Sequence, residues 1–249
     1  MRIAYGSDVG KKRAKNEDSV GNFKNKAGVV FVILADGLGG YQGGEVASEM
    51  AVSHLGYLFE QTELNNANDA KGWIEEKLVR ENQMIIERSK QYQDLEGMGT
   101  TVVCAMFFGN RCLIAHLGDS RAYILHNQKL MQLTEDHSLV NELVKRGEIS
   151  ADEAKHHPQK NIVTRTLGIS ENVSLDFDEL SLVSGDKVML CSDGLTNMVD
   201  DDVIENVLRK VGSLDNQCQE LIARANENGG NDNITVLLAD FSSKDGEMP

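Results

Sequence analysis

The chain of 249 residues has little of what marks a multidomain, membrane or secreted protein. Proline occurs only twice, and no Ser/Gly-rich or low-complexity stretch divides the sequence, so no linker is predicted. The apolar runs fall far short of the roughly 20 residues that span a bilayer, and the amino terminus has no basic segment followed by an apolar one. We therefore predict no membrane span, no secretory signal, and a single domain over residues 1–242 with a polar tail over 243–249.

Basic residues are also scarce. Lys and Arg total 25 against 39 Asp and Glu, which gives a formal net charge of −14. Such a surplus repels phosphate backbones and anionic lipid headgroups over most of the surface, so nucleic acid is a poor candidate partner. One local cluster, Lys11, Lys12, Arg13 and Lys15, stands out from this background. It could bind a single anionic group, or it could be a solvated basic turn.

The four cysteines include no C-x-x-C pair, and at least two of them lie inside apolar, strand-like runs where a small buried thiol is ordinary. We read this usage as that of a reducing, cytoplasmic protein. A cysteine phosphatase would need an arginine a few residues after its nucleophile, but Asn197 occupies that neighbourhood after Cys191. A structural role for Cys191 is therefore favoured.

The periodicity of apolar residues predicts an α+β fold with antiparallel hairpins. Short turns such as Gly109-Asn110 and Asn127-Gln128 join many of the expected strands. Strands are predicted at Ile3–Asp8, Val29–Ala35, Thr101–Phe108, Cys112–Leu117, Ala122–His126, Leu175–Leu182, Lys187–Cys191 and Ile234–Ala239. Amphipathic helices are predicted around 47–59, 73–85, 200–210 and 215–226. The polar stretch 135–168 resembles a partly helical surface excursion, of the kind that often forms a lid or binding loop.

One pattern occurs twice: an apolar run ends in an Asp followed by Gly, at Asp36-Gly37 and again at Asp193-Gly194. A buried strand end holds a carboxylate rigidly, and Gly allows a sharp turn and a close backbone approach. Asp-Gly is also the commonest hairpin dipeptide, so either copy alone is weak evidence for a site.

Two further aspartates, Asp119 and Asp232, lie next to predicted strands. If these strand ends converge, several carboxylates share a small volume and need cations to neutralise them. A site of carboxylates without interleaved Cys or His favours Mg²⁺ or Mn²⁺ over zinc. His116 and His137 each lie beside an acidic motif, and we read them as hydrogen-bonded structural residues. No P-loop, dinucleotide-binding or EF-hand spacing is present.

Taken together, these residues resemble the metal-dependent serine/threonine protein phosphatases of type 2C in their compact bacterial form, over nearly the whole chain. The resemblance implies a four-layer α-β-β-α sandwich with a metal site at one end, between two antiparallel sheets. It is carried by motifs in the family's order: Arg13 with Asn16-Glu17-Asp18, Asp36-Gly37-Leu38-Gly39-Gly40, Gly99-Thr100-Thr101, His116-Leu117-Gly118-Asp119-Ser120-Arg121, Thr134-Glu135-Asp136-His137-Ser138, Ser192-Asp193-Gly194-Leu195 and Asp232-Asn233-Ile234-Thr235.

By the same resemblance, two Mn²⁺ or Mg²⁺ ions occupy the core site. Asp36 looks like the carboxylate that bridges them, and Gly37 like the residue that offers a backbone carbonyl. Asp193 and Asp232 match the ligands of the second ion, and Asp119 matches the site of a weaker third ion shared with Asp193.

The remaining matches concern groups around the ions. Arg13 resembles the phosphate-binding arginine, whereas Glu17, Asp18 and Asn233 look like supporting groups that orient ligands and metal-bound waters. The implied reaction is in-line attack on phosphorus by a hydroxide that bridges the two ions. Leu38 stands where many eukaryotic members have a general-acid histidine, so the source of the leaving-group proton is open.

These observations predict a cytoplasmic phosphatase of phosphoserine and phosphothreonine proteins that opposes a serine/threonine kinase, with the stretch 135–168 as the family's flap. Two alternatives are a dedicated phosphatase of one small regulatory protein and a catalytically dead module that binds a kinase or phosphoprotein. The joint presence of Asp36, Asp193, Asp232 and Arg13 argues against the dead module, which has no need of so much mutually repelling charge.

Overall fold

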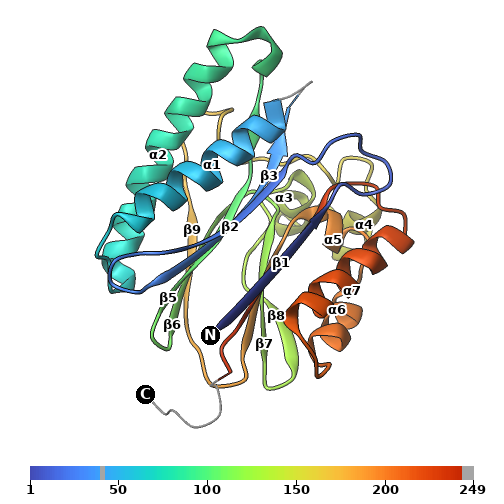
Figure 1. Ribbon diagram of the computed structural model, residues 1–249. Helices are drawn as coiled ribbons and strands as arrows, with labels where there is room; N and C mark the ends of the chain where they lie inside the picture. Colours follow the sequence, from blue (N-terminus) through green and yellow to red (C-terminus); the bar gives the residue numbers. More distant parts are fainter. Residues whose placement is uncertain (40–42, 243–249) are drawn as a thin grey trace.

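Two antiparallel β-sheets form the centre of the structure, a computed structural model that describes residues 1–39 and 43–242 (Figure 1). The first sheet has the strand order β1 (Arg2–Asp8), β11 (Ile234–Asp240), β10 (Lys187–Cys191), β7 (Arg121–His126) and β8 (Lys129–Gln132). The second has the order β2 (Asp18–Lys24), β3 (Val30–Leu38), β5 (Val102–Phe108), β6 (Arg111–Leu117) and β9 (Asp176–Ser181), and the short β4 (Gly99–Thr100) pairs with the end of β3.

Helices cover the outer face of each sheet. Helices α1 (Gly43–Glu60) and α2 (Ala67–Gln91) pack on the second sheet, and α6 (Asp201–Leu208) and α7 (Leu214–Glu227) pack on the first (Figure 1). The short α5 (Asp193–Thr196) follows β10, and a 3₁₀ turn spans Gln93–Leu95. The predicted four-layer α-β-β-α sandwich is therefore confirmed. No helix in the two described ranges is both long enough and apolar enough to cross a membrane.

Strand β3 shows why its sequence is a continuous apolar run. Successive side chains of a strand point to opposite faces of the sheet. Phe31 and Ile33 pack under helices α1 and α2, whereas Val32 and Leu34 pack between the two sheets. Both faces of β3 are buried, so apolar residues are needed at every position.

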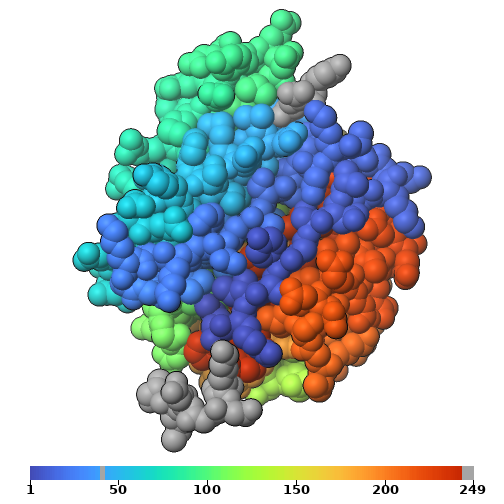
Figure 2. Space-filling model, in the orientation of Figure 1, coloured from blue at the N-terminus to red at the C-terminus, as the bar shows by residue number. Residues whose placement is uncertain are grey.

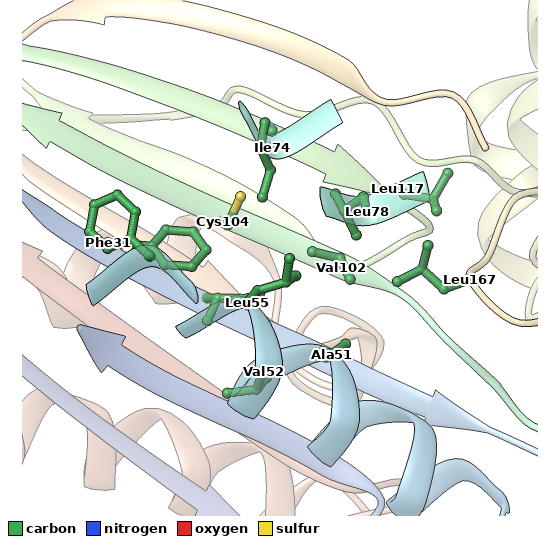
Figure 3. Packing of buried hydrophobic residues seen from close by; sticks show 14 of the residues in the cluster. Phe31, Ala51, Val52, Leu55, Ile74, Leu78, Val102, Cys104, Leu117 and Leu167 are labelled. Carbon is green, nitrogen blue, oxygen red and sulfur yellow. The ribbon is translucent and has the colours of Figure 1, made fainter. Parts of the chain in front are cut away.

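The layer between α1, α2 and the second sheet is a contiguous apolar core (Figure 3). On α1, Ala51 and Leu55 recur at the four-residue spacing of one helix face, and Ile74 and Leu78 do the same on α2. All four side chains are fully buried and belong to the same cluster as Cys104 of β5. These helices thus form where the predicted amphipathic faces lie.

Every strand and helix predicted from the sequence is present, although the ends differ and α2 extends well beyond the predicted 73–85 in both directions. Strands β2, β4 and β8 were not predicted. β2 is only half-buried and contains Gly21 and Asn22, so its sequence offers no apolar run. The Asn127-Gln128 turn is confirmed, with left-handed φ values of 49° and 64° that match a tight hairpin.

The stretch 135–168 is a partly helical excursion, as predicted. It contains α3 (Leu139–Lys145) and α4 (Ala151–His156), each begun by a serine N-cap whose side chain accepts a backbone N–H. A bridge between Ser138 and Val163 brings its two ends together. We call residues 135–168 the flap. The predicted tail 243–249 and residues 40–42 of the glycine-rich segment lie outside the described residues.

The amino-terminal segment lies against the carboxy-terminal part of the chain. In Figure 2 the blue amino-terminal residues and the orange-red residues of α6 and α7 are side by side on one face. The loop after β1 is fixed there by its backbone, because the N–H groups of Lys11 and Lys12 both donate to the carbonyl of Gly230. This contact places Arg13 next to the loop that carries Asp232.

Candidate functional site

The end of β3 places Asp36 between the two sheets. Asp18, the first residue of β2, lies opposite Asp36 in the strand register. The backbone of Asp36 is held on the other side, where its N–H donates to Thr101 Oγ1 at 3.0 Å and its carbonyl accepts from Thr100 Oγ1 at 2.9 Å. Both neighbours fix the position of the Asp36 carboxylate without using its oxygens.

The two Asp-Gly pairs do not form the sharp turns that the sequence suggested. β3 continues through Gly37 to Leu38, and Asp193 opens helix α5. Neither Gly37 nor Gly194 has a left-handed φ. Both positions require glycine because neighbouring backbone packs closely against them. A Cβ at Gly37 would lie 2.2 Å from the carbonyl oxygen of Gly44, and a Cβ at Gly194 would lie 2.0 Å from the carbonyl oxygen of Asn233.

Strands β10 and β11 bring Asp193 and Asp232 together. The strands are antiparallel neighbours, so the residues after β10 lie beside those before β11. Asn197 Nδ2 donates to Asp193 Oδ2 at 2.8 Å, one turn along from it. Arg13 Nη2 donates to Asp232 Oδ2 at 2.8 Å. Each carboxylate thus keeps an oxygen that these side chains do not use.

Asp18 connects the two sheets. Its Oδ2 accepts hydrogen bonds from Ser192 Oγ at 2.8 Å and from Thr235 Oγ1 at 2.6 Å, both on the first sheet's side. Its Oδ1 is buried and has no hydrogen-bond partner. A buried carboxylate oxygen without a partner carries a large desolvation cost, so a cation or an ordered water is expected beside it.

The carboxylates perturb one another strongly. Burial, and then repulsion from Asp18, Asp193 and other aspartates, raises the pKa of Asp36 well above its usual range. Burial, followed by repulsion from Asp193, raises the pKa of Asp119 to about 8. Burial also raises the pKa of Asp18 to about 7. For Asp193, burial and repulsion from Asp232 outweigh the nearby arginines and raise the pKa to about 6. A divalent cation would offset both the burial and the repulsion.

Arg13, Glu17 and Asn233 surround this cluster. Burial alone would lower the pKa of the Arg13 guanidinium, but the Asp232 carboxylate outweighs it and raises the pKa. Burial raises the pKa of Glu17, against the opposing effect of Arg13. Asn233 holds the amino-terminal loop, since its Oδ1 accepts the Glu17 N–H and its Nδ2 donates to the carbonyls of Val9 and Lys15. The structure therefore brings together every site residue predicted from the sequence.

A separate cluster lies at the base of the flap. It consists of His116, His137 and Asp176. The nitrogen and oxygen atoms with which these three side chains could bind a metal all lie within 4.8 Å of one another. His137 Nδ1 accepts the N–H of Gly118, so its Nε2 carries the proton that is donated to Asp176 Oδ2 at 3.0 Å. The Arg165 guanidinium lies 3.3 Å from the same Nε2. These hydrogen bonds agree with the structural reading of the histidines.

The cysteines are free and buried. Burial raises the pKa of the Cys191 thiol to about 12, so this residue is not a nucleophile at neutral pH. The hydroxyls of Ser192 and Thr235 were not predicted as site residues, although both lie in motifs whose aspartates were. Their role depends on β2, the strand that the sequence pattern did not reveal.

The protein phosphatase 2C sequence model matches residues 6–239 of this chain. The chain belongs to the protein phosphatase 2C family. The serine/threonine phosphatase stp of Listeria monocytogenes is 44% identical over 241 residues, which cover 96% of each protein. As a family member with such relatives, the chain is a protein serine/threonine phosphatase, and the family is metal-dependent.

Solved structures of phosphatases agree with this membership. The serine/threonine phosphatase of Streptococcus agalactiae superposes with a TM-score of 0.92 at 43% identity, over 95% of this chain and 98% of that one. The catalytic domain of the phosphatase PstP, solved in complex with two manganese ions, superposes with a TM-score of 0.85 at 35% identity, over 97% of this chain and 98% of that one. Both serine/threonine phosphatases are therefore similar to this chain in fold as well as in sequence.

Proposed function

We propose that this phosphatase removes phosphate from phosphoserine and phosphothreonine residues of proteins with two Mn²⁺ or Mg²⁺ ions and a weaker third. The observation that carries the proposal is the buried group of carboxylates at the meeting point of the sheets, with the unpartnered Oδ1 of Asp18 among them. All the donors on offer are oxygens, which suits hard divalent cations. The residues present therefore fit the ions that the family uses.

The proposed ligands follow the positions of the carboxylates. Asp36 would bridge the two ions, and the carbonyl of Gly37 would complete the first site. Asp193 and Asp232 would hold the second ion. Asp119, which is 8% exposed, would share the weaker third with Asp193. When bound, such ions acidify a water nucleophile and neutralise charge on the phosphoryl group.

The protein's own residues prepare this site in three ways. Ser192 and Thr235 hold Oδ2 of Asp18, and the buried Oδ1, which has no hydrogen-bond partner, would be available to a cation or to a water bound to one. Asn233 fixes the loop that carries Glu17 and Arg13. Arg13 is half-exposed and uses one nitrogen for Asp232, so further N–H groups of its planar fork are free to hold phosphate oxygens.

Replacing Arg13 with Ala should therefore raise KM for a phosphothreonine peptide by about 10- to 100-fold. This range corresponds to about 1.5–3 kcal/mol for one charge-assisted hydrogen bond. Steady-state kinetics at saturating Mn²⁺ would measure the effect, with Lys12→Ala as the control because Lys12 is anchored by its backbone. Equal losses in the two variants would indicate diffuse attraction instead of a specific contact.

The leaving-group proton does not need a histidine. Leu38 occupies the end of β3, and His137 uses both ring nitrogens for Gly118 and Asp176. We therefore expect His137→Gln to lower kcat by less than about tenfold if the protein stays folded. A positioned general acid contributes about 10²–10⁴ in rate, so its loss would be obvious. A kcat loss of a hundredfold with unchanged metal affinity would assign the proton to His137.

In the cell, we propose that the protein acts in the cytoplasm and opposes a serine/threonine kinase, with residues 1–242 as one catalytic domain that includes the flap. A panel of phosphothreonine and phosphoserine peptides of unrelated sequence tests whether the protein acts on many phosphoproteins or on one. Turnover of several peptides at similar kcat/KM is expected. Turnover of a single peptide would favour a dedicated phosphatase of one regulatory protein, and Mn²⁺-independent binding without turnover of any would favour a catalytically dead module.

A further inference from the structure

A cavity of about 810 Å³ lies between the flap and helices α5 and α6. Asp119 and Asp193 line one part of it, so it opens directly from the proposed metal ligands. Its volume is in the range of ligand-binding pockets and exceeds the space needed by a phosphorylated side chain alone. Helices α3 and α4 form the flap wall, and the start of α6 forms the opposite wall.

A chain of hydrogen bonds crosses between these two walls. Arg121, at the start of β7, donates from Nε and Nη2 to the two carboxylate oxygens of Asp136 in the flap, at 2.8 and 2.7 Å. Its Nη1 donates to the hydroxyl of Tyr123 at 3.0 Å. That hydroxyl donates in turn to Asp201 Oδ1, in the first turn of α6, at 3.1 Å. We call these four residues the cross-wall network.

The cross-wall network is built to hold a fixed geometry. Tyr123 is fully buried, and the side chains of Arg121 and Asp136 are only 27% and 18% exposed. A fork-to-fork pair between guanidinium and carboxylate restricts both distance and angle. Asn141 of α3 also donates to the Asp136 carbonyl at 2.8 Å, which extends the restraint into the flap helix. Arg121, Asp136 and Asp201 all line the cavity.

We propose that the cross-wall network positions the two walls of this cavity, which receives the polypeptide chain flanking the phosphorylated residue. The cavity is continuous with the carboxylates at which the phosphoryl group would react. The substrate polypeptide attached to that phosphoryl group would therefore enter the cavity. The four residues are positioning residues and do not touch the reacting atoms. This inference rests on the proposed function.

Two substrates separate the roles of cavity and metal centre. p-Nitrophenyl phosphate is small and reaches only the carboxylates, whereas a phosphothreonine peptide also needs the cavity. We expect Asp201→Ala and Tyr123→Phe to raise KM for the peptide about tenfold and to leave kcat/KM for p-nitrophenyl phosphate within about twofold. A tenfold change corresponds to about 1.4 kcal/mol. Tyr123→Phe removes no charge, so agreement of the two variants excludes a simple charge effect.

Two further variants sharpen the test. Asp201→Asn keeps a carbonyl acceptor for Tyr123 and should restore most of the peptide affinity. Asp215→Ala is the matched control, because Asp215 is also an exposed aspartate in the first turn of a helix but lies outside the cavity. Melting temperatures of all variants confirm that each is folded. The control should match the wild-type protein with both substrates.

Three results would overturn the inference. The first is an unchanged peptide KM in both Asp201→Ala and Tyr123→Phe. The second is an equal loss with both substrates accompanied by a higher Mn²⁺ requirement, since the network would then support the metal centre. The third is a wild-type protein that hydrolyses neither substrate with Mn²⁺, which would overturn the proposed function and with it the inference that depends on it.

Discussion

Asp36→Asn should reduce turnover of a phosphothreonine peptide by about a thousandfold or more at saturating Mn²⁺, while the protein remains folded. The substitution removes the charge of the carboxylate proposed to contact both ions but changes the side-chain volume little. A thousandfold loss corresponds to about 4 kcal/mol of transition-state stabilisation, which is within the range of metal-assisted catalysis. Phosphate release under single-turnover conditions would measure the effect directly.

The same variant should be more thermostable than the wild-type protein when both are stripped of metal. Asp36 is buried among Asp18, Asp193, Asp119 and Asp232, so removing its charge relieves repulsion. Asp178→Asn, on the exposed part of β9, is the control and should change neither turnover nor melting temperature. Near-wild-type rates for Asp36→Asn would show that Asp36 does not bridge the ions.

Without metal, the protein should lose stability as pH rises from about 4 to about 8. The folded-state pKa values of Asp193, Asp18 and Asp119 are raised to about 6, 7 and 8, whereas an unfolded aspartate titrates near 3.9. The folded protein therefore binds more protons than the unfolded chain in this window. By linkage, stability is highest below the unfolded pKa and falls through each folded pKa.

Urea denaturation in the presence of a chelator, at intervals from pH 5 to pH 8.5, would reveal this slope. Saturating Mn²⁺ should flatten it, because ligands neutralised by a cation no longer favour protons. The Asp240 carboxyl contributes little over this pH range. Burial would raise its pKa, but the hydrogen bonds from Ser242 and the charge of Arg2 outweigh burial and lower the pKa. Asp240 therefore affects stability only at more acidic pH. A metal-free protein whose stability is constant or rises over this range would contradict the proposed crowding of charge.

The sequence predicted the sheets well where both faces of a strand are buried. β3 is an example, because apolar residues at consecutive positions are visible without any knowledge of the partner strand. β2 was missed because it is half-exposed and its polar residues carry no periodic signal. Its first residue, Asp18, was still noted as part of an acidic pair, and its supporting role was assigned through resemblance to a family motif.

The carboxylates of the site were predictable for a similar reason. Asp36 directly follows a long apolar run, and Asp193 follows a shorter one after Ser192; such positions are held rigidly by the sheet. Of the two reasons given for the glycines, the sharp turn was wrong, whereas Gly37 and Gly194 do allow a close approach of neighbouring backbone. That close approach depends on segments distant in sequence, which local turn propensity does not describe.

The cross-wall network could not be found from sequence. Tyr123 and Asp201 lie on different elements, and neither residue carries a motif that points to the other. Arg121 does belong to a recognised motif, but its partner Asp136 is fixed only by how the flap folds back on β7. Hydrogen bonds between side chains of this kind are set by tertiary packing.

Dependence of the reaction on divalent ions is tested by phosphate release from a phosphothreonine peptide by the wild-type protein, measured after chelation and again after Mn²⁺ is restored. We expect no release with chelator, full release with Mn²⁺, and none from Asp232→Asn at the same Mn²⁺ concentration. Release that persists in excess chelator, or wild-type rates from Asp232→Asn, would contradict a reaction carried by divalent ions on the buried carboxylates.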